Sequence, residues 1–123
     1  MSLFYITYDT PTIINIRLTN LVENQNTFAE ITDVLYYFKH NANDKDTNAV
    51  LSKSLGSGIT LDSGNEKIVV TIAKADFGLD KIEKRKVYLV CLAVEFNSSG
   101  NYIEDYDPQV DRKVEILPDK IRA

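Results

Sequence analysis

The sequence predicts an all-β fold, a single antiparallel β-sandwich of seven or eight strands spanning residues 1–123. Three observations predict it. Apolar and polar side chains alternate with a period of two in one segment after another, β-branched and aromatic residues are frequent in those segments, and turn-forming residues separate them. An alternation of period two places one row of side chains in a core and the other in water. Each such segment is therefore expected to be a half-buried strand.

Four segments show this alternation clearly. In one of them Val34, Tyr36 and Phe38 share a face, because side chains two positions apart along a strand point the same way. The four segments are Thr12–Leu18, Val34–Lys39, Lys67–Ile72 and Lys113–Leu117.

The segment Val87–Phe96 differs because it is apolar on both faces. Tyr88 and Leu92 lie on one face, whereas Leu89 and Cys91 lie on the other. We expect this segment to be the central strand, with Cys91 as a small buried apolar residue.

Weaker alternation marks three further strands, and one or two turns of helix are expected within Ala73–Lys84. Seven or eight short strands separated by turn signals are typical of an immunoglobulin-like sandwich rather than a closed barrel. The sequence has no Trp and one Cys, so the sandwich must rest on apolar packing without a disulfide. The three weaker strands are Ala49–Leu55, Ile59–Leu61 and Tyr102–Tyr106.

The charge and hydropathy of the chain argue against two classes of partner. The formal net charge is -4, and the only short basic cluster is Lys84–Lys86, so we expect no nucleic acid partner. The longest apolar run, Val87–Val94, is less than half as long as a membrane-spanning helix, so we expect no membrane partner. The N-terminus lacks the pattern of a signal peptide, so the protein is expected to stay in the cytoplasm where it is made.

One acidic stretch matches part of the pattern of a calcium-binding loop. Asp44, Asp46 and Asn48 fill its first, third and fifth positions, but Ala49 replaces the turn Gly and Leu55 replaces the bidentate Glu. We therefore expect a polar connection between strands rather than a metal site.

No pattern in the sequence predicts catalysis. His40 is expected to be a solvated residue at a strand end, since no other His or Cys lies at a metal-binding spacing from it. Neither a glycine-rich phosphate loop nor a nucleophile motif is present. The sequence thus indicates a non-enzymatic protein without cofactors or metals.

The N-terminal segment, residues 1–11, is the candidate interface. It is too apolar to be a solvated tail, so it must bury its side chains either as an edge strand on its own sheet or against a neighbouring subunit. We favour the neighbouring subunit slightly, since Pro11 allows the segment to turn away from the strand that begins at Thr12. A homo-oligomer is then expected, with candidate interface residues Leu3, Phe4, Tyr5, Ile6 and Tyr8.

From Tyr37 onward the chain resembles an immunoglobulin-like domain found in virion proteins of bacteriophages and prophages, including the N-terminal domains of some baseplate upper proteins. The resemblance is carried by an apolar strand ending in Lys39, an Asp-rich segment closing on Asp46, Ala49 and Leu51, and a run of later motifs. These later motifs are Gly58–Leu61, Lys67–Ile72, Ala73–Asp76, the long strand with Tyr88, a turn with Gly100, and Lys113–Leu117.

The resemblance implies a structural protein that acts in virion assembly, in a head, neck, tail or baseplate, with itself and other virion proteins as partners. It implies no catalytic residues. The alternative is a small carbohydrate- or protein-binding β-sandwich module, whose contact residues would be exposed aromatics among Tyr5, Tyr8, Tyr102 and Tyr106.

Overall fold

The computed structural model describes residues 3–18, 27–41, 45–79, 82–104 and 113–117. They form one mixed β-sheet system with short helical turns, which confirms the all-β prediction. Each expected strand is present, and the ninth is the N-terminal segment. The strands are β1 (Leu3–Thr7), β2 (Thr12–Ile16), β3 (Ile31–Lys39), β4 (Leu51–Leu55), β5 (Gly58–Asp62), β6 (Lys67–Ile72), β7 (Val87–Phe96), β8 (Tyr102–Glu104) and β9 (Lys113–Leu117). The helices are η1 (Phe28–Glu30), η2 (Asp46–Asn48) and α1 (Lys74–Leu79).

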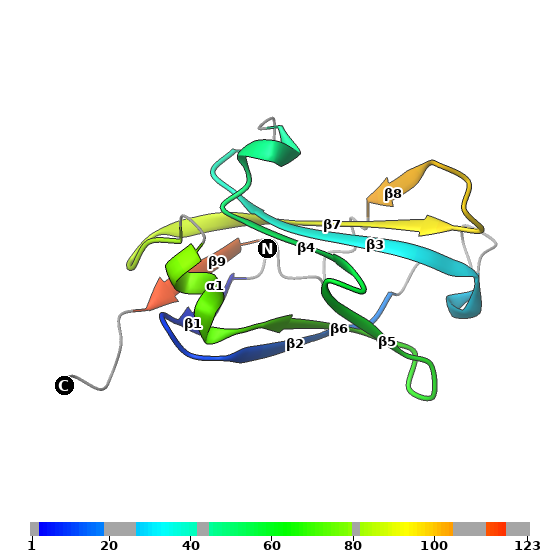
Figure 1. Ribbon diagram of the computed structural model, residues 1–123, viewed down its shortest axis with the longest axis horizontal. Coiled ribbons are helices and arrows are strands. Elements are labelled where there is room, and N and C mark those ends of the chain that lie inside the picture. The colour runs from blue at the N-terminus through cyan, green and yellow to red at the C-terminus, as the bar shows by residue number, and fades with distance from the viewer. Residues whose placement is uncertain (1–2, 19–26, 42–44, 80–81, 105–112, 118–123) are drawn as a thin grey trace.

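The strands form two layers, which Figure 1 shows edge-on. The strands form one continuous path in the order β1-β9-β7-β3-β4-β5-β6-β2, and β8 pairs with β7. In Figure 1 β7, β3 and β4 lie in the upper layer and β5, β6 and β2 lie in the lower one, while β9 and β1 slope down from the upper layer towards β2. We call the part from β1 to β4 the upper sheet. The chain crosses from one layer to the other between β4 and β5. Gly56 and Gly58 take φ values of 86° and 91° there, a region that favours glycine.

The strand pairing is mixed, so the expectation of a purely antiparallel sandwich needs correction at two places. β1 pairs with β9 in parallel, and β4 makes a short parallel pairing with β5 where the chain changes layer. Neither pairing is a hairpin: β1 and β9 are distant in sequence, and β4 and β5 meet only at the crossing. Local alternation in the sequence carries no information on such pairings.

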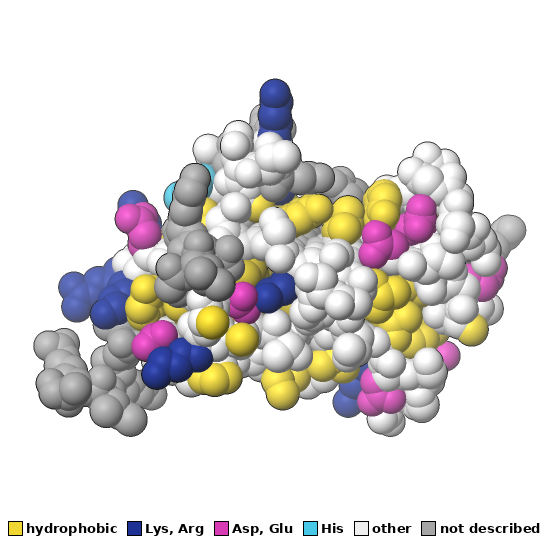
Figure 2. Space-filling view, in the orientation of Figure 1, with side chains coloured by type: hydrophobic (Ala, Val, Ile, Leu, Met, Phe, Trp, Pro, Cys, Tyr) yellow, Lys and Arg dark blue, Asp and Glu magenta, His cyan; other side chains and the backbone are white. Residues whose placement is uncertain are grey.

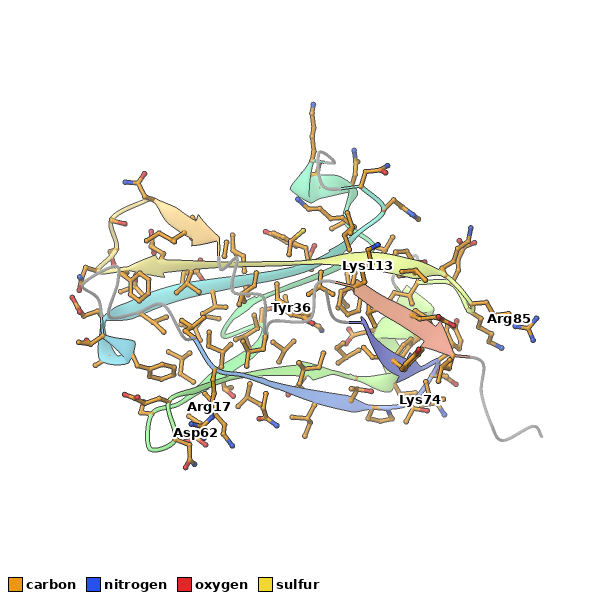
Figure 3. All side chains as sticks on the ribbon, turned by 180° about the vertical axis from the view of Figure 1, so that it is seen from behind. Arg17, Tyr36, Asp62, Lys74, Arg85 and Lys113 are labelled. Atoms are coloured by element: carbon orange, nitrogen blue, oxygen red, sulfur yellow. The ribbon has the colours of Figure 1, made fainter. Side chains whose placement is uncertain are left out.

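Apolar side chains from both layers fill the space between the sheets. Val34, Tyr36 and Phe38 are at most 1% exposed, as their alternation in β3 predicts, and Figure 3 shows Tyr36 between the layers. The same holds for β6 and β9. The other side chains that are fully or almost fully buried in the core include Ile59, Ile68, Val70, Ile72, Tyr88, Leu92, Val94, Val114 and Ile116.

One end of the core is closed by α1, which lies within the segment predicted to be helical. The Asp76 carboxylate accepts hydrogen bonds from the Ala73 backbone N–H at 2.7 Å and from Lys53 Nζ at 2.8 Å. This ion pair links α1 to β4. It is shielded from water, because the Lys53 and Asp76 side chains are only 13% and 17% exposed. Phe77, 2% exposed, is thereby placed over the core. The motif Ala73–Asp76, one of those that carry the family resemblance, thus has a structural role in this fold.

The N-terminal segment lies on the chain's own sheet as edge strand β1. Its residues pair with β9 from Leu3 opposite Lys113 to Thr7 opposite Leu117. Ile6 is 2% exposed and belongs to the core. Of the two placements considered for this segment, the structure shows the intramolecular one.

This placement predicts different effects for two isoleucines in edge strands. Ile6→Ala removes a buried side chain and should lower the free energy of unfolding by about 2–5 kcal/mol. Ile13→Ala is the matched control, because Ile13 in β2 is 65% exposed; its effect should stay within about 0.5 kcal/mol. Urea unfolding followed by circular dichroism measures both. Equal effects of the two substitutions would show that β1 does not contribute to the core.

Candidate protein-contact surface

The upper sheet has a second face, which points away from the core. We call it the outer face; it consists of the outward side chains of β1, β9, β7, β3, β4 and β8. Along β7 the outward side chains are Val87, Leu89, Cys91 and Ala93, which alternate with the buried ones. Val87 is 48% exposed and the other three are half-buried.

β7 lies between β9 and β3 in the sheet, but the expectation that Cys91 is buried is wrong, because Cys91 is half-buried. The core lies on one side of the upper sheet only, so the second apolar row of β7 points outward. An apolar row on an outward sheet face is a signal of a contact surface rather than of a core.

The outer face is hollowed near its middle. A cavity of about 170 Å³ is lined there by Leu35, Tyr37, Lys39, Cys91, Leu92, Ala93 and Tyr102. In Figure 2 the upper outline dips between η2 and β8, and hydrophobic side chains line the dip. The hollow is large enough to admit an apolar or aromatic side chain of a partner.

Lys39 lies in this hollow and is 6% exposed. Its Nζ atom is 5.3 Å from the centre of the Tyr37 ring, a distance at which an ammonium group is attracted to an aromatic face. The aliphatic part of the side chain adds to the apolar lining. Lys39 therefore fixes one wall of the hollow and orients the Tyr37 ring.

Tyr102 forms the opposite wall and is fixed by an acidic neighbour. Its hydroxyl donates a hydrogen bond of 2.5 Å to Asp33 Oδ2, while the Val34 backbone N–H donates to Asp33 Oδ1 at 2.8 Å. The hydrogen bond to Asp33 raises the pKa of Tyr102 to about 12, because the phenolate could not donate it and would lie beside a carboxylate. The tyrosine is thus a neutral donor at physiological pH.

The turn after β7 holds Tyr102 at this end of the face. Glu95 accepts hydrogen bonds from the Gly100 backbone N–H at 2.9 Å and from the Thr32 hydroxyl at 3.1 Å. Asn97, with φ of 55°, donates from Nδ2 to Glu30 at 2.7 Å. The hydrogen bonds from Asn97 and Thr27 hold the pKa of Glu30 below its usual value. A polar network therefore shapes the acidic end of the outer face.

The candidate interface residues of the N-terminal segment do not form one surface. Tyr5 is 57% exposed and belongs to the outer face, whereas Ile6 is in the core. Tyr8 is half-buried, and its hydroxyl donates to the Phe77 carbonyl at 3.3 Å. The side chains of Leu3 and Phe4 lie outside the described part of the chain. Among the described side chains of this set, Tyr5 is the one most exposed for contacts.

The other residues that the sequence analysis names lie partly inside and partly outside the described ranges. His40 is exposed at the end of β3, as expected, with its ring centre 5.2 Å from that of Tyr88. Asp44, Tyr106 and the Asp46 side chain lie outside the described residues. Within the described ranges, no group of three or more His, Cys, Asp or Glu side chains could hold a metal ion. No helix in the same ranges is long and apolar enough to cross a membrane.

Comparisons with known proteins add no assignment. No protein-family model matches the sequence, and no curated protein matches it. The surface must therefore be interpreted from its own geometry.

The hydrogen bond between Tyr102 and Asp33 predicts an unusual titration. In NMR spectra of protein with ¹³C-labelled tyrosine rings, Tyr102 should titrate near pH 12 instead of near its ordinary pKa of 10.0. Because the folded-state pKa is raised, the stability that this bond contributes is present below about pH 10 and is lost as the pH rises towards 12. Asp33→Asn should lower the pKa of Tyr102, and Tyr102→Phe assigns the resonance. A Tyr102 pKa that Asp33→Asn leaves unchanged would contradict this geometry.

Proposed function

We propose that this chain is a non-enzymatic structural protein of a bacteriophage or prophage particle. It is made in the bacterial cytoplasm and acts in the virion, in head, neck, tail or baseplate assembly, through protein-protein contacts. The observation that carries the proposal is the outer face, where an apolar row with a hollow at its middle faces away from an already filled core. The resemblance of the chain from Tyr37 onward points to the same role.

The order of the strands supports the immunoglobulin-like part of the proposal. In that fold a sheet with three adjacent strands C, F and G packs on a sheet that contains B, E and D. The neighbours β3, β7 and β9 match the first set, and β2, β6 and β5 match the second. Tyr36 and Tyr88, each at most 1% exposed, fill a core that has no disulfide.

The chemistry of the outer face favours a protein as partner. Stable protein interfaces combine an apolar centre with a polar rim and are enriched in tyrosine. Leu35, Tyr37 and Cys91 supply the centre, while Asp33 and Lys113 lie towards the ends. A net charge of -4 without a basic stripe does not suit a nucleic acid backbone.

The test begins with the genes beside the one that encodes this protein, since virion proteins are encoded together. The product of each flanking gene is co-expressed with this protein, and size-exclusion chromatography tests whether the two co-elute. We expect co-elution with at least one flanking virion protein. Leu89→Asp should abolish it, because a carboxylate would replace an apolar side chain of the outer face, whereas Ile13→Asp on the lower layer should not.

Neighbouring genes that encode no virion proteins would overturn the proposal. The proposal would also be overturned if this protein co-eluted with none of the flanking gene products. If co-elution is lost in Ile13→Asp and kept in Leu89→Asp, the contact lies on the lower layer and the outer face is not the binding surface.

A carbohydrate-binding module is the second candidate, because two tyrosines flank the hollow. Tyr37 and Tyr102 both line it, and sugar rings pack on aromatic side chains that lie beside hydrogen-bonding groups such as Asp33. A glycan array with the purified protein tests this function. Binding of a glycan that is lost in both Tyr37→Ala and Tyr102→Ala would favour it over the virion role.

A further inference from the structure

The outer face can be described as rows of side chains that run across the strands. Tyr5, Glu115 and Val87 form a row at one end, where β7 begins. Cys91 and Tyr37 are paired in the middle row. Residues paired in a ladder point to the same side of the sheet, so the rows follow directly from the strand register.

The row at the other end, where β7 finishes, contains Tyr102, Glu95 and Asp33. Three of the five large apolar side chains that are exposed in the described residues belong to the two end rows: Tyr5 at 57%, Val87 at 48% and Tyr102 at 41%. Each end of the face therefore combines an exposed apolar side chain with charges.

The two ends carry opposite charge. Lys39 and Lys113 both pair with Leu89 in the row next to the first end row, and Glu115 offsets their charge in part. Figure 3 shows Arg85 at this extremity of the molecule, and Figure 2 shows Lys and Arg side chains gathered there. The opposite end row carries the carboxylates of Asp33 and Glu95.

The charges at the two ends act separately. Val87 and Glu95 are eight positions apart along β7, which corresponds to about 27 Å at the rise of an extended strand. This exceeds the screening length of about 8 Å at physiological ionic strength. Each end therefore presents its own sign to a partner instead of being cancelled by the other end.

We propose that the outer face binds the outer face of a second copy of this chain, around a two-fold axis that lies between the copies and crosses the strands at the row of Cys91 and Tyr37. This inference rests on the proposed function and names one partner of the contact surface. The rotation places the basic end of each copy on the acidic end of the other. It also places Tyr102 of each copy against the end that carries Tyr5 and Val87, and it joins the two apolar centres.

The charges select this axis over the other two-fold arrangement. An axis along the strands would stack the acidic ends on each other and the basic ends on each other, and like charges across an interface cost several kcal/mol. The 37 residues of β1, β9, β7, β3, β4 and β8, at about 16 Å² of sheet each (about 3.4 Å by 4.8 Å), cover about 600 Å² per copy. Two copies then bury more than the roughly 1,000 Å² that a specific interface needs.

Cys91 reports on this arrangement because it is the only cysteine and lies in the row that the axis crosses. Packed sheets lie at least about 10 Å apart, and η2 and β8 stand above the upper sheet in Figure 1, whereas a disulfide needs α-carbons within about 6.8 Å of each other. The two Cys91 thiols should therefore be joined by a reagent with a short spacer and not by oxidation alone.

The first experiment uses a bismaleimide with a short spacer on the wild-type protein at micromolar concentration. We expect a covalent dimer on a denaturing gel. The matched control combines Cys91→Ala with Ile13→Cys, which moves the thiol to an exposed site on the lower layer, and it should give no dimer above the level of random collision. Equal dimer yields from the two proteins would overturn the proposal.

The second experiment reverses the charge of one end at a time. One variant carries Val87→Glu and Lys113→Glu, and the other carries Asp33→Lys and Ser54→Lys. Sedimentation equilibrium should show that each variant alone dimerises at least about tenfold more weakly than the wild type. A mixture of the two should form a heterodimer, because every end then meets its opposite charge. Circular dichroism checks that each variant folds.

A wild-type protein that remains monomeric at 100-fold higher concentration and gives no cross-link would overturn the self-association. The self-association would also be overturned if the two charge variants fold but do not form a heterodimer with each other. If the protein is monomeric but Leu89→Asp still abolishes co-elution with a flanking gene product, only the second-copy inference fails and the proposed function stands.

Discussion

The pairing of β3 with β7 is the constraint on which the rest of the structure depends. The ladder runs from Ile31 opposite Phe96 to Lys39 opposite Leu89. It sets Tyr36 beside Leu92 on the inner side and Tyr37 beside Cys91 on the outer side. Because side chains alternate with a period of two, a slip of one residue would exchange these faces. The same register therefore determines which side chains form the core and which form the outer face.

The remaining elements complete what this ladder begins. β9 pairs with the first half of β7 and carries β1 on its other edge, so Val114, Ile116 and Ile6 join the core from the same side. β8 pairs with the second half of β7 and brings Tyr102 to the outer face. The hollow thus lies on the outer side of residues whose inner neighbours form the core.

The sequence predicts the parts of this architecture in which the two faces of a strand differ. Ile68, Val70 and Ile72 alternate with Lys67, Val69 and Thr71, two of which are polar, and the three alternating apolar residues are fully buried. Val87–Phe96 offers no such contrast, so alternation cannot tell which of its two apolar faces is covered. For this reason the sequence predicts Cys91 to be buried, whereas the structure places it half-buried on the outer face.

The outer face as a whole was also missed because it is assembled across strands that are distant in sequence. Asp33 and Tyr102 are separated by 69 positions, and Tyr5 meets Glu115 only through the parallel pairing of β1 with β9. The apolar character of the N-terminal segment predicts that it buries side chains, but it does not name the sheet that receives them. The second apolar row in VYLVCLAVEF was the available signal of a contact surface. A strand that borders the core on one side needs only one apolar face.

We propose that the register of β3 and β7 creates the outer face on the side opposite the core, and that a second copy of the chain binds this face. Methyl NMR spectra recorded over a 100-fold range of protein concentration test this self-association. We expect the methyl resonances of Leu35, Leu89 and Ala93 to shift with concentration, while those of Ile13 on the lower layer and Ile59 in the core do not. Shifts confined to Ile13, or resonances that do not depend on concentration at any of these sites, would contradict it.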